Sequence, residues 1–545
     1  MPEEQPPADP GAGSDWNWSR PEGGAQDPAA DPGSREAAAH AGPVRARHAL
    51  PRDEDFRRTV GFTVLGTVVP GVGLLAAGRR VAGSIVLALF VLVLLTIGLA
   101  ALVDRDALIE VGVNPTMLRR LSIVLIVVAA LWVAVVVATH VTLLHRPTRP
   151  QRIIGGVLVG VLAFAVAAPM AVAARTAYVQ AGLVGTLFKS SGETKSATRP
   201  TVNAAQPGDK EQASDPWADQ ARLNILLLGG DAGKGRVGTR TDTVILASID
   251  TKTGDTTLFS LPRNTARMPF PSDSPLKRYY PNGFTDGNPD NAEFFLNAMY
   301  RDVPVKVPKN VLGDTDNLGA DVMKLSVGQA LGLKVDYYVL INLEGFAKMV
   351  DALGGVRLNV NTYIPIGGNT DLHIPPKEYL HPGANQKLDG RSTLWYARGR
   401  YGSDDFARMD RQRCVINAMI KQANPANVLT RYEDIANASK SIVYTDVPQE
   451  VLPAMVDLSL RVKKGNVRSV VFKNGVSGFL SANPDFSQMR SRVKKAIGET
   501  ESDNTPAKTT GSGSGGGAKA PTSEDVDSTC KYDPKVAATA KPYTG

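Results

Sequence analysis

The chain is poor in the residues that build cysteine-rich or histidine-rich sites. Its 545 residues include only 2 cysteines and 6 histidines. Two cysteines exclude a disulfide-dense scaffold and a cysteine-rich metal centre. After residue 222, histidine occurs only at His373 and His381, both near prolines, and no Gly-x-Ser-x-Gly motif is present. A zinc site and a Ser/His/Asp hydrolase are therefore poorly supported.

The two ends of the chain lack hydrophobic periodicity. Residues 1–58 begin with a stretch rich in Pro, Gly, Ala and acidic residues, and residues 501–545 contain a Gly/Ser run. Such segments bury too little apolar surface to offset the entropic cost of ordering. We expect a disordered cytoplasmic tail at 1–58 and a disordered tail at 501–545. Cys530 lies in the second tail, and it either carries a free thiol or forms a disulfide with Cys414. An oxidising compartment favours the disulfide.

Long apolar runs are concentrated between residues 59 and 188. The runs at 81–103, 121–144 and 153–174 each reach the ~20 residues that a helix needs to cross a bilayer. The stretch 59–78 is also apolar, but Pro70 and several glycines interrupt it. We expect a transmembrane region at 59–188 with three firm spans, in which 59–78 either spans or is re-entrant.

Arginines beside these runs indicate the orientation of the chain. They form two groups, before and after the first two firm spans: Arg52, Arg57, Arg58, Arg79 and Arg80, then Arg146, Arg149 and Arg152. Cytoplasmic loops carry an excess of arginine, and three crossings place both groups in the cytoplasm. We therefore expect a multi-pass protein of the cell membrane whose C-terminal domain is extracytoplasmic.

The region after the membrane segment divides into a polar stalk at 189–221 and a folded domain at 222–500. Residues 223–228 and 243–249 have the pattern of buried strands, whereas 321–331, 343–353 and 405–422 have helical spacing. Because strands and helices intermix, we expect an α/β domain with a mixed sheet flanked by helices. The net charge of +8 is weak evidence for a nucleic-acid partner. The expected topology places the basic cluster outside the cell, so we expect no nucleic acid.

Two acidic residues follow strand-like runs near the start of this domain. Asp231 follows Gly229 and Gly230, and Asp242 precedes the second run, two residues after Arg240. Strand ends are where sites form in α/β sheets, so the two carboxylates could be adjacent. Paired carboxylates suit Mg²⁺, which shares its ligands with substrate phosphates. The alternative for the Gly-Asp pair is an ordinary turn.

Arginine clusters make up the remaining candidates. Arg263 and Arg267 follow the strand-like run at 256–259. In an extended segment Arg398 and Arg400 would point to one face, and paired guanidinium groups match phosphate oxygens. On a helix Arg408 and Gln412 would share a face. That helix alone is best explained as a solvated face with acidic partners. Arg398 and Arg400, however, lie in an apolar segment, where an anionic ligand is the simplest compensation.

These residues, in this order, resemble the LytR-CpsA-Psr family of membrane-anchored proteins with an extracytoplasmic catalytic domain. The match runs from about residue 223 to 472. It rests on the Gly-Asp after the first strand, Arg-Thr-Asp at 240–242, Pro-Arg at 262–263, Asp-Ala-Leu-Gly-Gly-Val at 351–356, Leu-Asp-Gly at 388–390, Tyr-Ala-Arg-Gly-Arg at 396–400, and Asp405 through Arg411-Gln412. Each piece alone is modest, but in this order they are specific.

The resemblance implies a metal-dependent phosphotransferase that moves a glycopolymer from a polyprenyl pyrophosphate carrier to peptidoglycan. Its partners would be that lipid-linked glycopolymer, peptidoglycan and the membrane, and its cofactor Mg²⁺ or Mn²⁺. The residues carried over have three roles. Asp231 and Asp242 would hold the metal; Arg240, Arg263 and Arg267 would act on the pyrophosphate, with Asp405 as the candidate base; and Arg398, Arg400, Arg408 and Gln412 would bind substrate.

Two positions depart from the family pattern. Phe295 precedes a Leu-Asn pair where many members carry lysine, and Asn264 stands where an acid is common. These departures leave a second hypothesis open, a polyprenyl-phosphate-binding scaffold or regulator of wall assembly that does not turn over. Lipid binding without product would distinguish it from the transferase.

Overall fold

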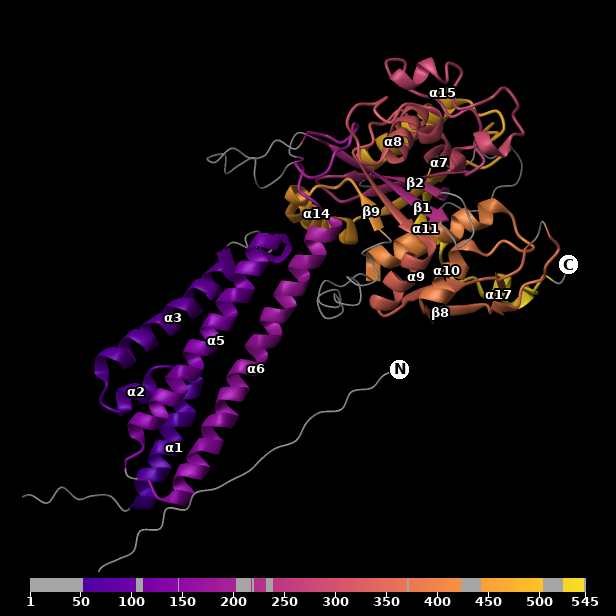
Figure 1. Cartoon of the computed structure of the whole chain (residues 1–545). Coiled ribbons are helices and arrows are strands. Elements are labelled where there is room, and N and C mark those ends of the chain that lie inside the picture. Colours follow the sequence, from indigo (N-terminus) through magenta and orange to yellow (C-terminus); the bar gives the residue numbers. More distant parts are fainter. Residues whose placement is uncertain are drawn as a thin grey trace, which may run out of the picture. The chain divides into compact units, whose positions relative to one another are not determined.

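A computed structural model describes residues 52–103, 111–145, 147–201, 217, 220–231, 239–369, 372–422, 443–502 and 523–543 (Figure 1). Most of the tail expected at 1–58 lies outside these residues, as do 503–522. The last seven residues of that expected tail, 52–58, are already helical, because α1 spans Arg52–Val68.

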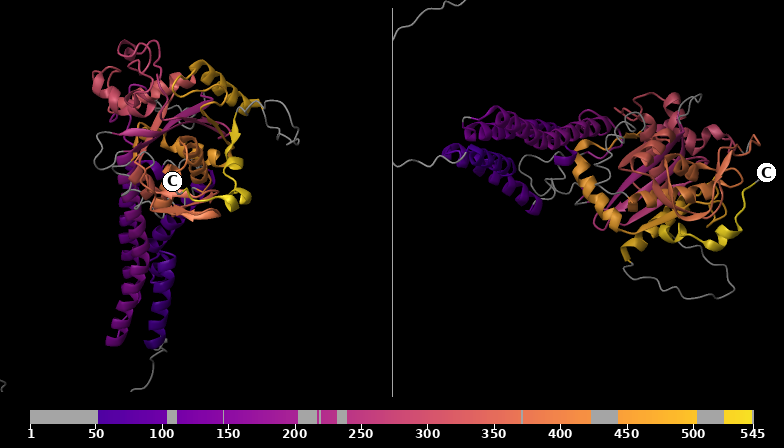
Figure 2. Two further views of the ribbon diagram at one scale, coloured as in Figure 1. Left: turned by 90° about the vertical axis from the view of Figure 1, so that its right-hand side faces the viewer. Right: turned by 90° about the horizontal axis from the view of Figure 1, so that it is seen from below.

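Three helices are long and apolar enough to cross a membrane: α3 (Arg80–Val103), α5 (Pro115–Leu143) and α6 (Arg149–Leu187). Helices α3 and α6 contain the expected spans 81–103 and 153–174, and α5 covers 121–144 except for its last residue. The cap residues explain where two of them begin. Asn114 accepts hydrogen bonds from the backbone N–H of Thr116 and Met117 before α5, and Gln151 accepts one from the backbone N–H of Thr148 before α6. Helices α5 and α6 run side by side in Figures 1 and 2.

The weaker apolar stretch at 59–78 forms two helices instead of one. Helix α1 ends at Val68, and the short α2 (Val72–Ala76) begins after Pro70, which cannot continue a helix. The turn after α1 brings α2 back against α1. The two helices approach so closely that a Cβ on Gly66 would lie 3.2 Å from the Cα of Gly73. In α1, Thr63 also contacts His140 of α5, with 3.2 Å between Oγ1 and Nδ1.

The C-terminal domain is built on a seven-stranded sheet in the order β11-β10-β3-β2-β1-β4-β9. Parallel and antiparallel pairs both occur: β1 pairs antiparallel with β2 and parallel with β4. The sheet is mixed and flanked by helices, which confirms the expected α/β class. Its strands are β1 (Arg222–Asp231), β2 (Arg240–Asp250), β3 (Thr256–Leu261), β4 (Tyr337–Asn342), β9 (Val443–Thr445), β10 (Val467–Val471) and β11 (Glu524–Asp525).

Alternating side chains on β2 build a core on each face of the sheet. Val244 and Leu246 pack with residues of α7 (Leu296–Lys306), α8 (Leu318–Leu331) and α15 (Phe486–Ser502). Ile245 and Ala247 face the other way, toward Ile416 and Ile420 of α11 (Asp405–Gln422). This follows from the two-residue period of a strand. Figure 2 shows helices on both sides of the strands.

The remaining elements surround the second face or connect the strands. They are α9 (Leu343–Ala352), α10 (Gly390–Arg398), α14 (Leu452–Lys464), α16 (Val526–Thr529), α17 (Pro534–Thr539), three 3₁₀ turns (Pro275–Arg278, Ala292–Phe294 and Gln449–Val451), and two small two-stranded sheets, β5 (Val356–Val360) with β8 (Gly383–Leu388) and β6 (Ile364–Ile366) with β7 (Glu378–Leu380). Helices α8, α9 and α11 confirm the three helical predictions.

The segment that carries Arg398 is helical, so the extended conformation considered for Arg398 and Arg400 does not occur there. Asp389 caps α10 by accepting a hydrogen bond from the backbone N–H of Ser392. The helix then buries Thr393 and Tyr396, which lie three residues apart on one face. Arg398 is the last residue of this helix, and Arg400 follows in the next loop.

The expected stalk and the C-terminal tail both contain ordered residues that pack on the domain. In the segment 189–201, Ser196 and Thr198 donate hydrogen bonds to the carboxylate of Asp321, and Lys195 pairs with Asp314. Disorder of the tail is also wrong for residues 523–543. Val526 is fully buried, and β11 pairs with β10. A disulfide also joins Cys530 to Cys414. Of the two alternatives for the cysteines, the structure contains the bridge.

Candidate functional site

A pocket of ≈ 420 Å³ opens between the sheet and helices α9, α10 and α11. One set of lining residues is polar: Asp242, Thr243, Arg263, Asn342, Arg398, Arg400, Arg408 and Gln412. The rest is mostly apolar: Leu227, Leu228, Val339, Ile341, Leu343, Phe346, Met349, Leu394, Val415, Ile416, Met419 and Ile420. Six of the predicted site residues therefore line one cavity together with Asp242's neighbour Thr243, and the cavity is amphipathic.

Asp242 occupies a β-bulge between β1 and β2. Gly229 pairs with Thr243 and Gly230 with Thr241, so Asp242 is the extra residue on its strand. A bulge redirects a side chain and is common beside functional sites. The close approach of the two strands requires glycine, because a Cβ at position 229 would lie 2.8 Å from the Cβ of Thr243.

The carboxylate of Asp242 is held by two side chains from other elements. Arg263 donates from Nη1 to Oδ1 at 2.8 Å, and Asn297 of α7 donates from Nδ2 at 3.4 Å. Arg408 donates to the backbone carbonyl of Asp242 at 2.9 Å. Burial alone would raise the pKa of Asp242, but the positive charges of Arg263 and Arg408 and these hydrogen bonds lower it below its usual value. The carboxylate is therefore ionised at neutral pH.

Asp405, the first residue of α11, lies among three guanidinium groups. Its Oδ1 is 3.0 Å from Nη2 of Arg408, 3.5 Å from Nε of Arg263 and 4.0 Å from Nη1 of Arg400. One carboxylate thus connects arginines from three separate segments. This arrangement positions the arginines at the polar end of the pocket.

Helix α11 directs Arg408 and Gln412 toward the sheet, one turn apart. Both are buried, and Gln412 donates to the hydroxyl of Thr243 at 2.8 Å. Burial lowers the pKa of Arg408 to about 10, against the opposing effect of Asp405. The guanidinium therefore remains charged at neutral pH. A charge kept in so little water interacts strongly with an anion.

Arg398 and Arg400 reach the pocket from the end of α10 and the loop after it. Arg398 lies over the ring of Trp395, 5.0 Å from its centroid. Arg411 supports this loop from α11, because its Nε donates to the carbonyl of Tyr396 at 2.7 Å and its Nη2 to the carbonyl of Gly399. Arg411 is thus a positioning residue for the segment that carries Arg398 and Arg400.

Three predicted site residues lie outside this group. Arg240 does not line the pocket and instead pairs with Glu293. Arg267 is exposed and has a φ of 51°, a left-handed conformation that is uncommon outside glycine. The backbone of Asp231 ends β1 opposite Arg240, but its side chain lies outside the described residues.

Sequence reasoning missed Asn297, Thr243 and Glu293, each of which contacts a predicted residue. Asn297 is 55 residues from Asp242 in the chain, and Glu293 is 53 residues from Arg240. No local pattern reports such contacts, because they arise where α7 and the turn before it pack against β2. The Leu-Asn pair at 296–297 was the one available signal.

The residues present fit a metal that is shared with substrate oxygens, and not a metal enclosed by protein alone. Among the residues that the structure describes, no group of three or more His, Cys, Asp and Glu side chains converges. Asp242 offers one ionised carboxylate at the polar end of the pocket. Mg²⁺ is often bound by one or two carboxylates together with phosphate oxygens and water.

Comparison with known proteins gives a consistent result. The family model described as LytR_cpsA_psr family matches residues 187–477. A protein of Oceanobacillus iheyensis named polyisoprenyl-teichoic acid–peptidoglycan teichoic acid transferase TagU is 24% identical over 303 residues, which cover 54% of this chain and 82% of the relative. Biofilm regulatory protein A of Streptococcus mutans is 27% identical over 313 residues, which cover 55% of this chain and 69% of the relative.

A solved structure also matches about half of the chain. The crystal structure of TagV from B. subtilis matches with 23% identity and a TM-score of 0.35, covering 51% of this chain and 96% of that one. The family match begins at residue 187, at the end of α6, and includes all of the lining residues of the pocket.

Proposed function

The chain belongs to the LytR-CpsA-Psr family, and on that premise we propose that it is a membrane-anchored phosphotransferase that moves a glycopolymer from a polyprenyl pyrophosphate carrier to peptidoglycan. The amphipathic pocket is the observation that carries this proposal. Arginine side chains surround its polar end, and aliphatic side chains from the sheet, α9 and α11 line the remainder. A pyrophosphate linked to an isoprenoid chain has the same division into an anionic head and an apolar tail.

The transfer forms one bond and breaks one. A hydroxyl oxygen of the acceptor forms a bond to the phosphorus that bears the glycopolymer, and the bond from that phosphorus to the bridging oxygen of the pyrophosphate breaks. The polyprenyl phosphate leaves with the bonding electron pair, and a base accepts the hydroxyl proton. Arg263, Arg398, Arg400 and Arg408 would neutralise the charge of the phosphates. Asp405 is the candidate base, and its contacts with three arginines also give it a positioning role.

Mg²⁺ or Mn²⁺ is part of this proposal. Asp242 would hold the ion, with Asp231 as the second predicted ligand. Such an ion supplies charge neutralisation at the pyrophosphate. Arg263 pairs with Asp242, and this contact fixes its guanidinium group at the polar end of the pocket.

The location follows from the same premise. We propose a multi-pass protein of the cell membrane, with α3, α5 and α6 as the crossings and the C-terminal domain outside the cytoplasm. Peptidoglycan and the lipid-linked polymer would then be within reach of the pocket, and no nucleic acid is among the proposed partners.

The test uses the full-length chain in lipid nanodiscs, a polyprenyl pyrophosphate carrying a radiolabelled glycan, and a peptidoglycan acceptor. We expect label in the acceptor that depends on Mg²⁺ or Mn²⁺. Arg263→Ala should reduce transfer by about 100-fold or more, because it removes a cation that neutralises the pyrophosphate and the polyprenyl phosphate that leaves. Arg391→Ala is the matched control, because Arg391 is exposed, pairs with Glu378 and does not line the pocket. Equal transfer in the two variants would reject the proposal.

A non-catalytic scaffold is the second candidate. It is favoured by Phe295, which stands at the start of α7 where many relatives carry lysine, so that one cation is lacking there. In the same assay a scaffold would retain the labelled lipid and yield no labelled peptidoglycan at saturating metal.

A further inference from the structure

Glu293 holds two arginines that come from different elements. One carboxylate oxygen, Oε1, contacts Nη2 of Arg240 on β2, and the other, Oε2, contacts Nη2 of Arg301 on α7. Half of the glutamate side chain is exposed to solvent (51%), whereas the two arginines are less exposed, at 29% and 23%. The two guanidinium groups therefore converge on one point at the surface, and a carboxylate occupies that point.

This arginine pair lies close to the polar end of the pocket. Arg240 lies two residues before Asp242 on β2, a short step along the chain that includes the β-bulge. Arg301 lies four residues after Asn297 on α7, a step of ~6 Å along a helix, on the same face. Because Asn297 contacts Asp242, both steps begin at the same place. Arg240 and Arg301 thus form a second cationic group, one step beyond the arginines of the pocket.

The ion pairs of Glu293 with the two arginines are weak. An exposed ion pair contributes little free energy, because water and salt screen the attraction between its charges. A phosphate group carries more acceptor oxygens than a carboxylate, and two guanidinium groups match them well. Asp302 fixes Arg301 independently of Glu293, with 2.8 Å between Nη2 and Oδ2. Arg301 can therefore exchange Glu293 for another anion and remain in place.

We propose that Arg240 and Arg301 form an outer phosphate subsite and that Glu293 occupies it until substrate binds. The inference rests on the proposed function, since it assigns the outer of the two phosphates of a lipid pyrophosphate to this pair and the inner phosphate to the arginines of the pocket. Glu293 is then a competitor of the substrate, and Arg301 is an additional substrate-binding residue.

The proposal makes an unusual prediction, a substitution that improves binding. Glu293→Gln keeps the size of the side chain but removes the charge that competes with phosphate. We expect farnesyl pyrophosphate to bind the full-length Glu293→Gln variant roughly threefold more tightly than the unchanged protein. Farnesyl monophosphate, which lacks the outer phosphate, should bind both proteins equally. Misfolding cannot produce this gain, because a damaged site binds less.

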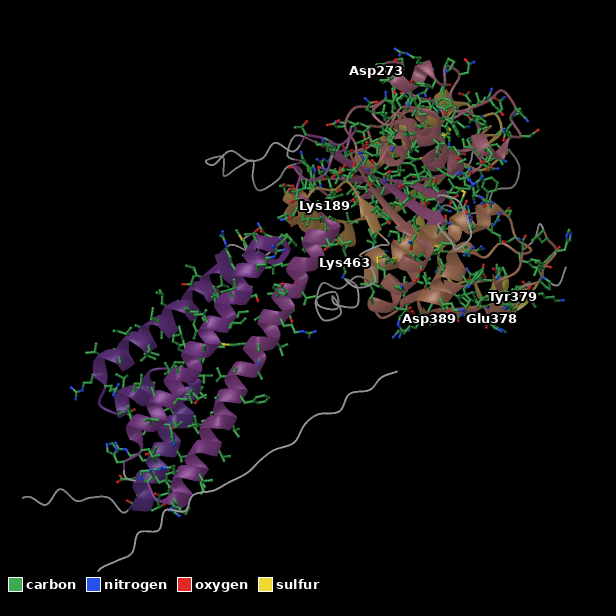
Figure 3. All side chains as sticks on the ribbon, in the orientation of Figure 1. Lys189, Asp273, Glu378, Tyr379, Asp389 and Lys463 are labelled. Carbon is green, nitrogen blue, oxygen red and sulfur yellow. A yellow bond between two sulfur atoms is a disulfide. The ribbon has the colours of Figure 1, made fainter. Side chains whose placement is uncertain are left out.

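Two further variants complete the test, measured by isothermal titration calorimetry in detergent. Arg301→Gln should weaken binding of farnesyl pyrophosphate by roughly tenfold and leave the monophosphate unaffected. Glu378→Gln is the control, since Glu378, labelled in Figure 3, is equally exposed (50%) and also pairs with an arginine, but lies outside the pocket. It should change neither affinity.

The outcomes separate this inference from the proposed function. If Glu293→Gln binds the pyrophosphate no more tightly than the unchanged protein, or gains equally for the monophosphate, the outer subsite is rejected while the transferase proposal stands. If the unchanged protein binds neither farnesyl compound at millimolar concentration, the proposed function itself fails.

Discussion

Asp242 shows how one residue can combine strand geometry with charge. The bulge turns its side chain out of the regular β1–β2 ladder, and Arg263 then holds the carboxylate at 2.8 Å. Arg408, which is buried, fixes the backbone at the same position through the carbonyl. Two arginines are thus placed at the polar end of the pocket before any ligand arrives. Such preorganisation lowers the cost of binding an anion.

The lowered pKa of Asp242 predicts a pH dependence of stability. A carboxyl group whose pKa is lower in the folded state stabilises the fold fully above its unfolded pKa of about 4, and this contribution is lost as pH falls through the folded pKa. Asp242→Asn should cost roughly 1–3 kcal/mol at pH 7, because Arg263 loses a charged partner. Thermal unfolding of the full chain and the variant, followed between pH 3 and 7, should show a difference that is constant above about pH 5 and shrinks below pH 4. A difference that grows on acidification would contradict the assignment.

At the scale of elements, α11 joins the pocket to the C-terminal tail. Arg408 and Gln412 face the sheet, and Cys414, one half-turn later, carries the disulfide to Cys530. The tail adds further contacts, since Asp527 accepts a hydrogen bond from Asn417 at 2.8 Å and pairs with Lys421. The position of α11, and with it the pocket contacts of Arg408 and Gln412, therefore depends on residues that lie more than one hundred positions downstream.

Removing the disulfide should loosen this helix. Replacing both Cys414 and Cys530 with serine should lower the free energy of unfolding by roughly 2–4 kcal/mol, because the unfolded chain regains the freedom of a loop of 116 residues. Calorimetric melting in detergent measures this change. A reducing agent should lower the melting temperature of the unchanged protein and leave the doubly substituted protein unaffected. Equal sensitivity of the two proteins to the reductant would contradict the prediction.

The elements differ in how much of them the sequence predicts. Helix α11 was predicted with its observed bounds, because Asp405 begins it and its apolar residues recur at helical spacing. Helix α10 was missed, since its arginines and aromatic residues obscure a short periodic pattern that only the cap at Asp389 reveals. The order of the tail could not be predicted, because a Gly/Ser-rich composition gives no sign that Val526 is buried in a core built by distant strands.

The candidate site was predicted unevenly for a related reason. The motifs identified side chains that share one pocket, because Arg263, Arg398, Arg400, Arg408 and Gln412 line it together with Asp242. The partners that hold them come from elsewhere in the chain. Packing of α7 against β2 places Asn297 at Asp242 and Glu293 at Arg240, and packing cannot be read from local sequence.

At the scale of the whole molecule, the number of membrane crossings determines on which side of the membrane the C-terminal domain lies. The expected orientation depends on whether the stretch at 59–78 crosses the bilayer. In the structure Pro70 separates α1 from the short α2, so the stretch at 59–78 is not one continuous helix. Among the described residues, three helices are long and apolar enough to cross a bilayer, and three crossings are what the proposed orientation needs.

Labelling of single thiols tests the orientation. Both native cysteines are in the disulfide, so an introduced cysteine is the free one. His145→Cys, between α5 and α6, and Asp273→Cys, on an exposed loop labelled in Figure 3, report on opposite ends of α6. An impermeant maleimide should label Asp273→Cys on intact cells and His145→Cys only after permeabilisation. The reverse pattern would place the domain in the cytoplasm.

The tail also determines when the domain can be finished during biosynthesis. Cys530 and the edge strand β11 are made after every other strand of the sheet, and Cys530 follows Cys414 by 116 residues. At ~5–20 residues per second, a ribosome needs roughly 6–23 seconds to pass from one cysteine to the other. During that interval α11 has emerged without its covalent partner. The bridge to α11 can therefore form only after Cys530 has been made, when the apolar helices α3, α5 and α6 are already complete.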